Sequence, residues 1–211
     1  MADAVHDRRL SVILLAAGHS SRMGTFKPLL PFGSSNLYGF QLQQLAEIGA
    51  EETIVVLGAN ADQLRSRTPS QVSAVFNPDH PTGRASSIRA GVTQAKSDRD
   101  VLIISVDQPR PAWFLRRLID RHLDGAHLVS LPTFRGRNGH PTVFSHTLRD
   151  ELLAVEERSQ GLKAVVRRHA TEINRVEIDS EWTLVNLNHP EDYEQALAIG
   201  LGESVRRDGA G

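Results

Sequence analysis

Residues 11–31 read SVILLAAGHSSRMGTFKPLLP, and this stretch decides the fold class. Its run Val12–Leu15 is bulky and does not alternate with polar residues, which is typical of a strand buried on both faces of a parallel sheet. Gly18 ends the strand, and small and polar residues follow, with cations at Arg22 and Lys27. Small residues, exposed backbone N–H groups and two cations at a strand end can hold polyphosphate. The spacing fits neither the Walker A nor the G-x-G-x-x-G template.

Three later runs of the first half have the same buried-strand character and end in small or polar residues. The runs are 53–57, 72–76 and 100–106, followed by Gly58, Asn77 and Asp107. Helical periodicity at 37–48, with Asn36 as a cap, and helical segments at 61–67 and 86–96 separate the strands. The alternation predicts right-handed βαβ units and a mostly parallel sheet. Because ligands bind outside the carboxyl ends of such strands, we expect these four strand ends to face one crevice.

The second half is less regular. A helix is expected at 111–123, strands at 127–134 and 141–145 around a turn with an Asn-Gly pair, helices at 146–155 and 160–169, and strands at 173–178 and 183–187. Pro190 opens a last helix with Asn188 or His189 as its cap. The prediction is a single-domain, Rossmann-like three-layer α/β/α fold over residues 10–200, with a small antiparallel β-hairpin region. Residues 1–9 and 201–211 are expected to be a flexible arm and a flexible tail.

Composition narrows the functional classes. The 24 Lys and Arg residues against 25 Asp and Glu residues give a net charge of -1, so no global field attracts nucleic acid or an anionic membrane. The absence of cysteine excludes disulfides, thiol catalysis and thiolate metal sites. The pair Arg8-Arg9 precedes an apolar run that is too short for a good signal peptide, and no run approaches a membrane span of about 20 residues. These features predict a soluble cytoplasmic protein.

The opening loop resembles that of nucleotidyltransferases that join an NTP to a phosphorylated acceptor. Their pattern is roughly L-A-A-G-x-S-x-R-M-G-x-x-K-x-L-L-P, and residues 15–31 match every fixed position. The resemblance is to the MobA-like NTP transferase family, GT-A-like nucleotidyltransferases, and is strongest to the molybdenum cofactor cytidylyltransferase type. The alternative is an ordinary glycine-rich βα turn with Arg and Lys on the surface.

The resemblance implies a nucleotide site in the first half. Its residues would be Leu15, Ala16, Ala17, Gly18, Ser20, Ser21, Arg22, Gly24, Lys27, Asn77, Gly83 and Ser87. Loop amides would hold the triphosphate, Arg22 the departing pyrophosphate, and Lys27 the charge developing around the α-phosphate. Taken without the resemblance, the segment at Gly83 and Ser87 is an N-capped helix, with Ser86 or Ser87 as the cap.

A metal site is implied at the end of the strand 100–106. Mg²⁺ takes one or two protein carboxylates plus substrate phosphates, so Asp107 is enough to begin a site. Taken alone, Asp107 could equally be a helix N-cap; the resemblance implies that it binds Mg²⁺. The family's second metal position resembles Asn186-Leu187-Asn188 here, which makes Asn188 the second candidate ligand. Asn188 as a plain N-cap stays open.

The acceptor side is implied by residues 136–144, GRNGHPTVF, which resemble the family's G-x-x-G-H-P-x-x-F segment. The candidate acceptor-binding residues are Gln108, Arg137, Gly139, His140 and Lys163. His140 could bind the acceptor or be a structural turn residue. Arg135, Arg137 or Lys163 could neutralise the acceptor's phosphate.

The motifs also bear on the substrates. Ala16-Ala17-Gly18 is similar to pyrimidine-using relatives, which favours CTP over GTP, and the Asp-Gln-Pro, Gly-His-Pro and Pro-Glu-Asp-Tyr motifs favour a molybdopterin-type acceptor. A molybdoenzyme would then receive the product. Three alternatives remain: a sugar- or polyol-phosphate nucleotidyltransferase, a guanylyltransferase of the same family, and a non-catalytic nucleotide- or cofactor-binding maturation factor.

Overall fold

The computed structural model describes residues 10–18 and 26–208, with backbone alone for 201–208. The strands are β1 (Leu10–Ala16), β2 (Pro31–Phe32), β3 (Ser35–Asn36), β4 (Glu52–Leu57), β5 (Ser73–Phe76), β6 (Asp100–Ser105), β7 (Val129–Phe134), β8 (Arg137–Asn138), β9 (Thr142–Phe144) and β10 (Ile173–Glu177). The helices are α1 (Leu37–Glu47), α2 (Ala61–Arg65), α3 (Arg84–Gln94), α4 (Ala112–Leu123), α5 (Arg149–Leu153), α6 (Leu162–Arg168) and α7 (Pro190–Asp208). The predicted arm 1–9 and the loop positions Ser20, Ser21, Arg22 and Gly24 lie outside the described residues.

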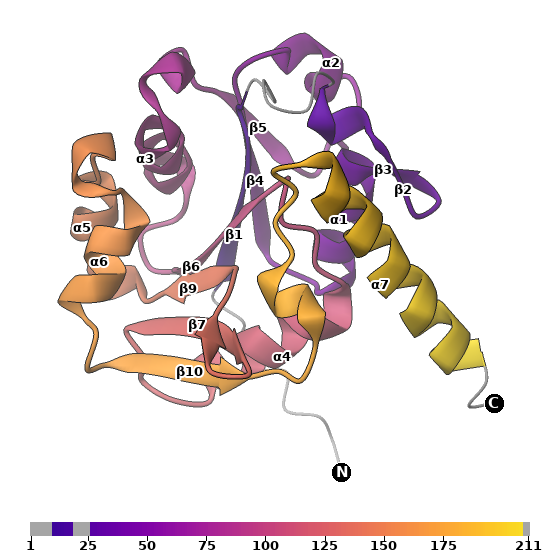
Figure 1. Cartoon of the computed structure of the whole chain (residues 1–211). Coiled ribbons are helices and arrows are strands. Elements are labelled where there is room, and N and C mark those ends of the chain that lie inside the picture. The colour runs from indigo at the N-terminus through magenta and orange to yellow at the C-terminus, as the bar shows by residue number, and fades with distance from the viewer. Residues whose placement is uncertain (1–9, 19–25, 209–211) are drawn as a thin grey trace.

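Within the described residues, eight strands form one sheet in the order β10-β7-β9-β6-β1-β4-β5, with β8 paired to β7 (Figure 1). The central strand β1 is parallel to both neighbours, with Ile13 opposite Ile54 of β4 and Ile103 of β6. Strand β9 runs antiparallel to β6 and to β7, and β8 antiparallel to β7. The expected mostly parallel sheet with a small antiparallel region is therefore confirmed.

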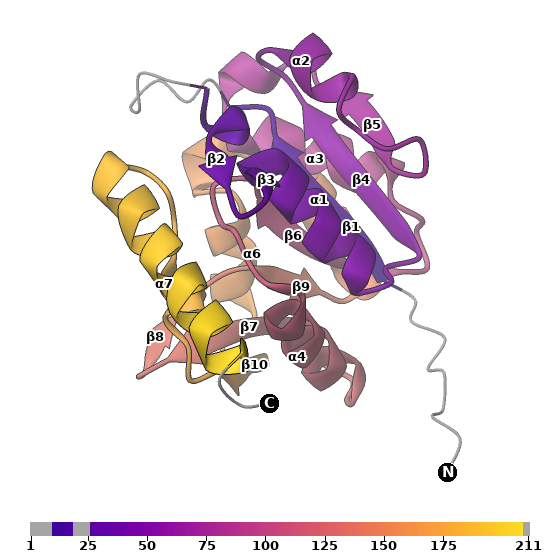
Figure 2. The ribbon, with the colours of Figure 1, turned by 90° about the vertical axis from the view of Figure 1, so that its right-hand side faces the viewer.

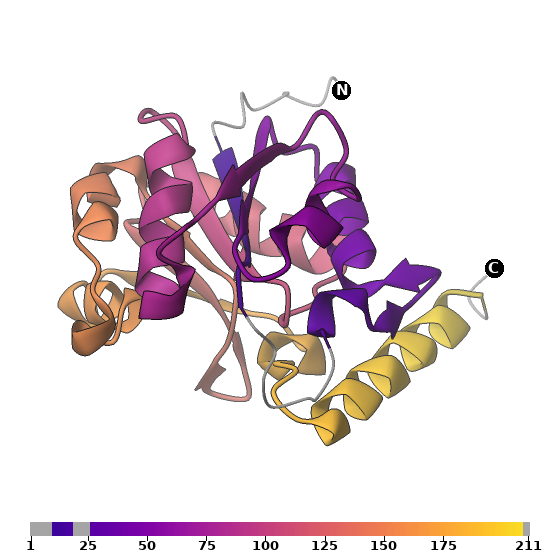
Figure 3. The same ribbon diagram turned by 90° about the horizontal axis from the view of Figure 1, so that it is seen from above.

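Two apolar cores lie on opposite faces of this sheet. Val12 and Leu14 belong to the core beneath α1, α4 and α7, whereas Ile13 and Leu15 belong to the core beneath α3, α5 and α6. Both sides of β1 are therefore buried, which explains why its sequence has no polar alternation. Figures 2 and 3 show α1 and α7 on one side of the sheet and α3, α5 and α6 on the other. None of the helices in the described part of the chain has the length and apolar character of a membrane span.

Two expectations for the second half are wrong in detail. The tight turn between β7 and β8 is made by Arg135 and Gly136, both with positive φ, and not by the Asn-Gly pair, since Asn138 lies in β8. Helix α7 continues to Asp208, so helical backbone covers residues 201–208 of the segment 201–211 for which a flexible tail is expected. The predicted helix 146–155 is a 3₁₀ turn, His146–Leu148, followed by the short α5.

The predicted strand 183–187 is also wrong. Residues Glu181–Leu184 form a 3₁₀ turn, and the side chain of Ser180 accepts a hydrogen bond from the Trp182 N–H at its start. The carbonyls of Thr183 and Val185 accept hydrogen bonds from Arg110, at 3.2 and 3.0 Å, and not from a neighbouring strand. The segment therefore satisfies its backbone groups without joining the sheet.

Arg110 is a fully buried cation that joins three separate segments. Its guanidinium donates to the carbonyls of Pro109 (2.7 Å) and His140 (2.9 Å) as well as to those of Thr183 and Val185. Burial lowers its pKa to about 9, against the opposing effect of Asp107, so it remains charged at neutral pH. The loop after β6, the start of β9 and the chain before α7 are held together by one side chain.

We predict that Arg110→Met lowers the free energy of unfolding by about 3 kcal/mol or more, because four carbonyls lose the hydrogen bond from this buried guanidinium. Urea unfolding of the full chain measures this. Arg117→Met is the matched control on the exposed face of α4 and is expected to change the same quantity by less than about 0.5 kcal/mol. Equal losses in the two variants would contradict the role given to Arg110.

Candidate active site

A pocket of about 300 Å³ lies at the carboxyl ends of β1 and β6; we call it the strand-end pocket. Seven of the predicted residues line it, namely Leu15, Ala17, Gly18, Lys27, Gly83, Ser87 and Asp107, together with His80 and Arg84. The parallel pairing of β1 with β6 explains why residues 90 positions apart in the sequence share this pocket. Lys27 is buried, whereas Asp107 is partly exposed.

Asn77 lies behind the pocket and does not line it. Its amide nitrogen donates to the hydroxyls of Ser86 (2.9 Å) and Ser87 (3.0 Å), and its amide oxygen accepts from the Asp79 N–H. The end of β5 is thereby tied to the start of α3. Ser87 accepts this bond, so its own hydroxyl hydrogen is not needed there and can be donated to a ligand in the pocket. Ala16 is likewise buried within β1.

Helix α3 begins at Arg84, two residues earlier than predicted, and Ser86 and Ser87 are therefore not its N-cap. The cap position is Gly83, whose φ of 120° favours glycine. A carboxylate oxygen of Glu157 accepts a hydrogen bond from the Ala85 N–H at 2.9 Å, which satisfies one of the unpaired donors of the first turn. A Cβ at position 83 would lie 2.6 Å from Cδ of Glu157, so only glycine permits this approach.

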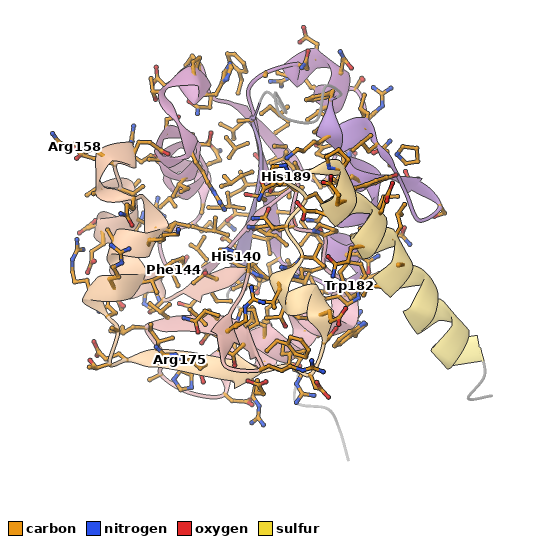
Figure 4. All side chains as sticks on the ribbon, viewed as in Figure 1. His140, Phe144, Arg158, Arg175, Trp182 and His189 are labelled. Carbon is orange, nitrogen blue, oxygen red and sulfur yellow. The ribbon has the colours of Figure 1, made fainter. Side chains whose placement is uncertain are left out.

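A larger cavity of about 710 Å³ lies beside the β7–β8 turn, and we call it the hairpin pocket. Four predicted acceptor-side residues line it, namely Gln108, Gly139, His140 and Lys163. Because β9 is antiparallel to β6, its beginning lies beside the end of β6, and His140 is brought next to the loop that carries Gln108. Figure 4 shows His140 near the centre of the view, and its side chain is partly buried. Arg137 is exposed on β8 and does not line this pocket.

Two side-chain oxygens in the hairpin pocket have no hydrogen-bond donor among the described residues. They are Oε1 of Gln108 and Oδ1 of Asn186, both buried. Gln108 is held from behind, because its backbone carbonyl accepts from the side chain of Gln41 at 3.0 Å. A buried acceptor without a partner is costly, so these atoms indicate a ligand or solvent donor at this position.

His140 is neutral at physiological pH. Burial, together with the positive charges of Arg84, Arg110 and Lys163, lowers its pKa to about 4. A neutral imidazole has one N–H donor and one acceptor nitrogen. His140 is therefore suited to hydrogen bonding and does not add charge to the pocket.

The donor set fits a metal ion that is completed by substrate. Among the described residues, no group of three or more His, Cys, Asp or Glu side chains could hold a metal by itself. Asp107 offers one carboxylate in the strand-end pocket, which matches the way Mg²⁺ binds one or two carboxylates and substrate phosphates. The Leu187 N–H donates to the Asp107 carbonyl at 2.8 Å, so the backbone of the next residue, Asn188, lies close to Asp107. The Asn188 N–H itself donates to Asp192, and its side chain does not line either pocket.

A family model described as the MobA-like NTP transferase domain matches residues 12–173, which include every lining residue of the two pockets except Asn186. The chain belongs to the MobA-like NTP transferase family. It is 25% identical to the molybdenum cofactor cytidylyltransferase of Escherichia coli K12, over 87% of this chain and 93% of that one. It is 28% identical to a probable molybdenum cofactor guanylyltransferase of Opitutus terrae, over 88% and 94%.

The chain is also similar to proteins that carry other names. The nicotine blue oxidoreductase of Paenarthrobacter nicotinovorans is 30% identical over 81% of this chain and 88% of its own. Among solved structures, a nucleotidyl transferase from Methanothermobacter has a TM-score of 0.79 at 26% identity, covering 92% of this chain and 99% of that chain. Rv0371c of Mycobacterium tuberculosis has a TM-score of 0.78 at 25% identity, covering 90% and 98%. The Rossmann-like nucleotidyltransferase fold is confirmed, and so is this chain's place among nucleotidyltransferases.

Sequence reasoning missed three residues of the site. Arg84 and Glu157 line the hairpin pocket, and Arg110 holds His140 in place. Asn186, which the sequence placed at the second metal position, carries one of the unpartnered oxygens of the hairpin pocket. Arg84 could have been predicted from the sequence, because it directly follows Gly83 in the segment assigned to the nucleotide. Glu157 and Arg110 could not, because their hydrogen-bond partners are distant in the sequence.

We predict that the His140 ring stays neutral down to about pH 5, since its pKa is about 4 in the folded state. The unfolded chain, with a pKa near 6.5, binds the proton first. His140 therefore costs no stability above pH 6.5, and stability is lost as pH falls from 6.5 towards 4. NMR titration, with the signal assigned by its absence in His140→Gln, measures the pKa. A midpoint near 6.5 would contradict the burial of this ring.

Proposed function

We propose that this chain transfers CMP from CTP to a phosphorylated pterin of the molybdopterin type and releases pyrophosphate. The observation that carries the proposal is the contact between the two pockets. Asp107 lines the strand-end pocket, the next residue Gln108 lines the hairpin pocket, and Arg84 lines both. Two substrates in these pockets would meet at the end of β6. Nucleotidyl transfer requires such a meeting of an α-phosphate and an acceptor phosphate.

The chemistry needs positioning and charge neutralisation more than proton transfer. An oxygen of the acceptor phosphate forms a bond to the α-phosphorus, the bond from that phosphorus to the bridging oxygen breaks, and pyrophosphate leaves. The acceptor is already an anionic nucleophile, so no general base is required. Lys27, buried at the pocket wall, would neutralise charge at the α-phosphate, and Arg22 would hold the pyrophosphate.

A divalent metal ion is part of this proposal. Nucleotidyltransferases of this family generally use one, and Rv0371c has also been solved as a complex with manganese. In this chain Asp107, with Asn188 as a second candidate, would hold Mg²⁺. When bound, the ion would neutralise phosphate charge and polarise the reacting phosphoryl group.

The choice of CTP over GTP is based on the loop that begins at Ala16 and on the names of relatives. Ala16-Ala17-Gly18 resembles the loop of pyrimidine-using nucleotidyltransferases, and the E. coli relative is named a cytidylyltransferase. The Opitutus relative is named a guanylyltransferase, so GTP is the main competitor. For the acceptor, the neutral His140 and the oxygens of Gln108 and Asn186 offer hydrogen-bond partners to a heterocycle with N–H groups, and Lys163 offers a cation to its phosphate. A sugar- or polyol-phosphate acceptor is the alternative in the same pocket.

A second candidate function comes from the relative with 30% identity, which is named an oxidoreductase. The strand-end pocket could then hold a dinucleotide reductant in place of an NTP. Consumption of reduced nicotinamide nucleotide in the presence of an oxidised heterocyclic substrate, without pyrophosphate release, would favour that function.

We expect the purified chain with Mg²⁺ to release pyrophosphate when it is given CTP together with a molybdenum-loaded pterin cofactor. Each of the four NTPs is assayed in turn, with and without the pterin. Release with GTP in preference to CTP would contradict the assignment of the base. Release with a sugar or polyol phosphate, and none with the pterin, would contradict the assignment of the acceptor. NTP binding without release from any pair would favour the non-catalytic binding module.

We predict that Asp107→Asn lowers turnover at least about 100-fold, because the pocket loses the carboxylate that would hold the metal. Steady-state pyrophosphate release over a range of Mg²⁺ concentrations measures the change. Asp98→Asn, which removes the same charge from an exposed loop, is the matched control and should leave turnover unchanged. Unchanged turnover in Asp107→Asn would show that the metal lies elsewhere.

A further inference from the structure

Arg84 lies where the two pockets adjoin, and it lines both of them. It is the first residue of α3, so its position is set by the Gly83 cap and by the hydrogen bond from the Ala85 N–H to the Glu157 carboxylate. The side chain is exposed to the cleft. Among the described residues its guanidinium has no hydrogen-bond or ion-pair partner, although Asp107 and Glu157 act on it electrostatically.

The surroundings favour an anion beside this guanidinium. Loss of hydration lowers the pKa of Arg84, while Asp107 and Glu157 oppose that change, and the group remains a cation at neutral pH. The positive charge of Arg84 also reaches His140, whose pKa it lowers. The amino end of α3, an 11-residue helix, adds partial positive charge at the same place. A planar guanidinium can bind two phosphate oxygens at once.

We propose that Arg84 is a catalytic residue that binds the phosphate of the acceptor at the junction of the two pockets and holds it against the α-phosphate. This inference rests on the proposed nucleotidyl transfer. The acceptor oxygen that is held there forms the new bond to the α-phosphorus, and the bond to the departing pyrophosphate breaks. No oxidation state changes, and no proton has to be moved.

Glu157 has a separate part in this arrangement. Its carboxylate accepts from the Ala85 N–H and supports the turn that carries Arg84, but its negative charge also opposes an incoming phosphate. Glu157→Gln keeps an oxygen that can accept this hydrogen bond and removes the charge. A purely structural Arg84 and a phosphate-binding Arg84 therefore predict different results for this variant.

The experiment is calorimetric titration of the full chain with inorganic phosphate, in the presence of Mg²⁺ and α,β-methylene CTP, and again without nucleotide. Arg84→Gln is expected to weaken phosphate binding at least about tenfold, and Arg84→Lys to weaken it less, because charge is kept but the fork is lost. Glu157→Gln is expected to bind phosphate as tightly as the wild type or more tightly. Arg158→Gln, which removes an exposed cation paired with Glu156, is the matched control and should bind as the wild type does.

Three results would overturn the inference. They are phosphate binding by Arg84→Gln within twofold of wild type, a loss in Glu157→Gln as large as that in Arg84→Gln, and no detectable phosphate binding by the wild type. In the pyrophosphate assay, Arg84→Gln is expected to raise KM for the acceptor more than KM for the NTP. If the wild type releases no pyrophosphate, the proposed function fails, whereas the phosphate titration still decides the role of Arg84.

Discussion

The buried guanidinium of Arg110 is the interaction on which the geometry of the cleft depends. Within the described residues it donates hydrogen bonds only to carbonyl groups, which come from the loop after β6, from His140 and from the chain before α7. A buried charge without a carboxylate partner is costly, so its hydrogen bonds have to be complete. This requirement holds together three segments that are not paired as strands where Arg110 joins them. Each segment contributes a side chain to the hairpin pocket.

The antiparallel insertion of β9 is the second constraint. In a fully parallel sheet every strand beginning would lie at the edge opposite the cleft. Because β9 runs against β6, the residues that precede β9 lie at the cleft edge, beside Gln108. Gly139 belongs to this arrangement, since a Cβ there would lie 2.1 Å from the Thr183 carbonyl oxygen. The acceptor side thus depends on a close backbone approach that only glycine allows.

Sequence patterns predicted the parts of the fold that depend on local chemistry. The buried strands, the α1 cap at Asn36 and the gathering of Gly18 and Asp107 follow from periodicity, turn residues and the strand-end rule. The failures have a shared cause. The apolar segment 183–187 has strand-like composition, but its carbonyls bind Arg110, 73 positions away for Thr183. Ser86 has the composition of a cap, yet the cap is Gly83 with help from Glu157. Partners so distant leave no local signal.

Positively charged side chains line both pockets of the cleft. Lys163 lines the hairpin pocket, Arg84 lines both pockets and Lys27 lines the strand-end pocket, so cations occur along the full path that two phosphorylated substrates would occupy. Burial, helped by the charges of Arg84, Arg110 and Lys163, keeps His140 neutral, so the hairpin pocket has a hydrogen-bonding group there and not a further charge. Under the proposed function, an anion and a polar heterocycle would be recognised by different residues of one pocket.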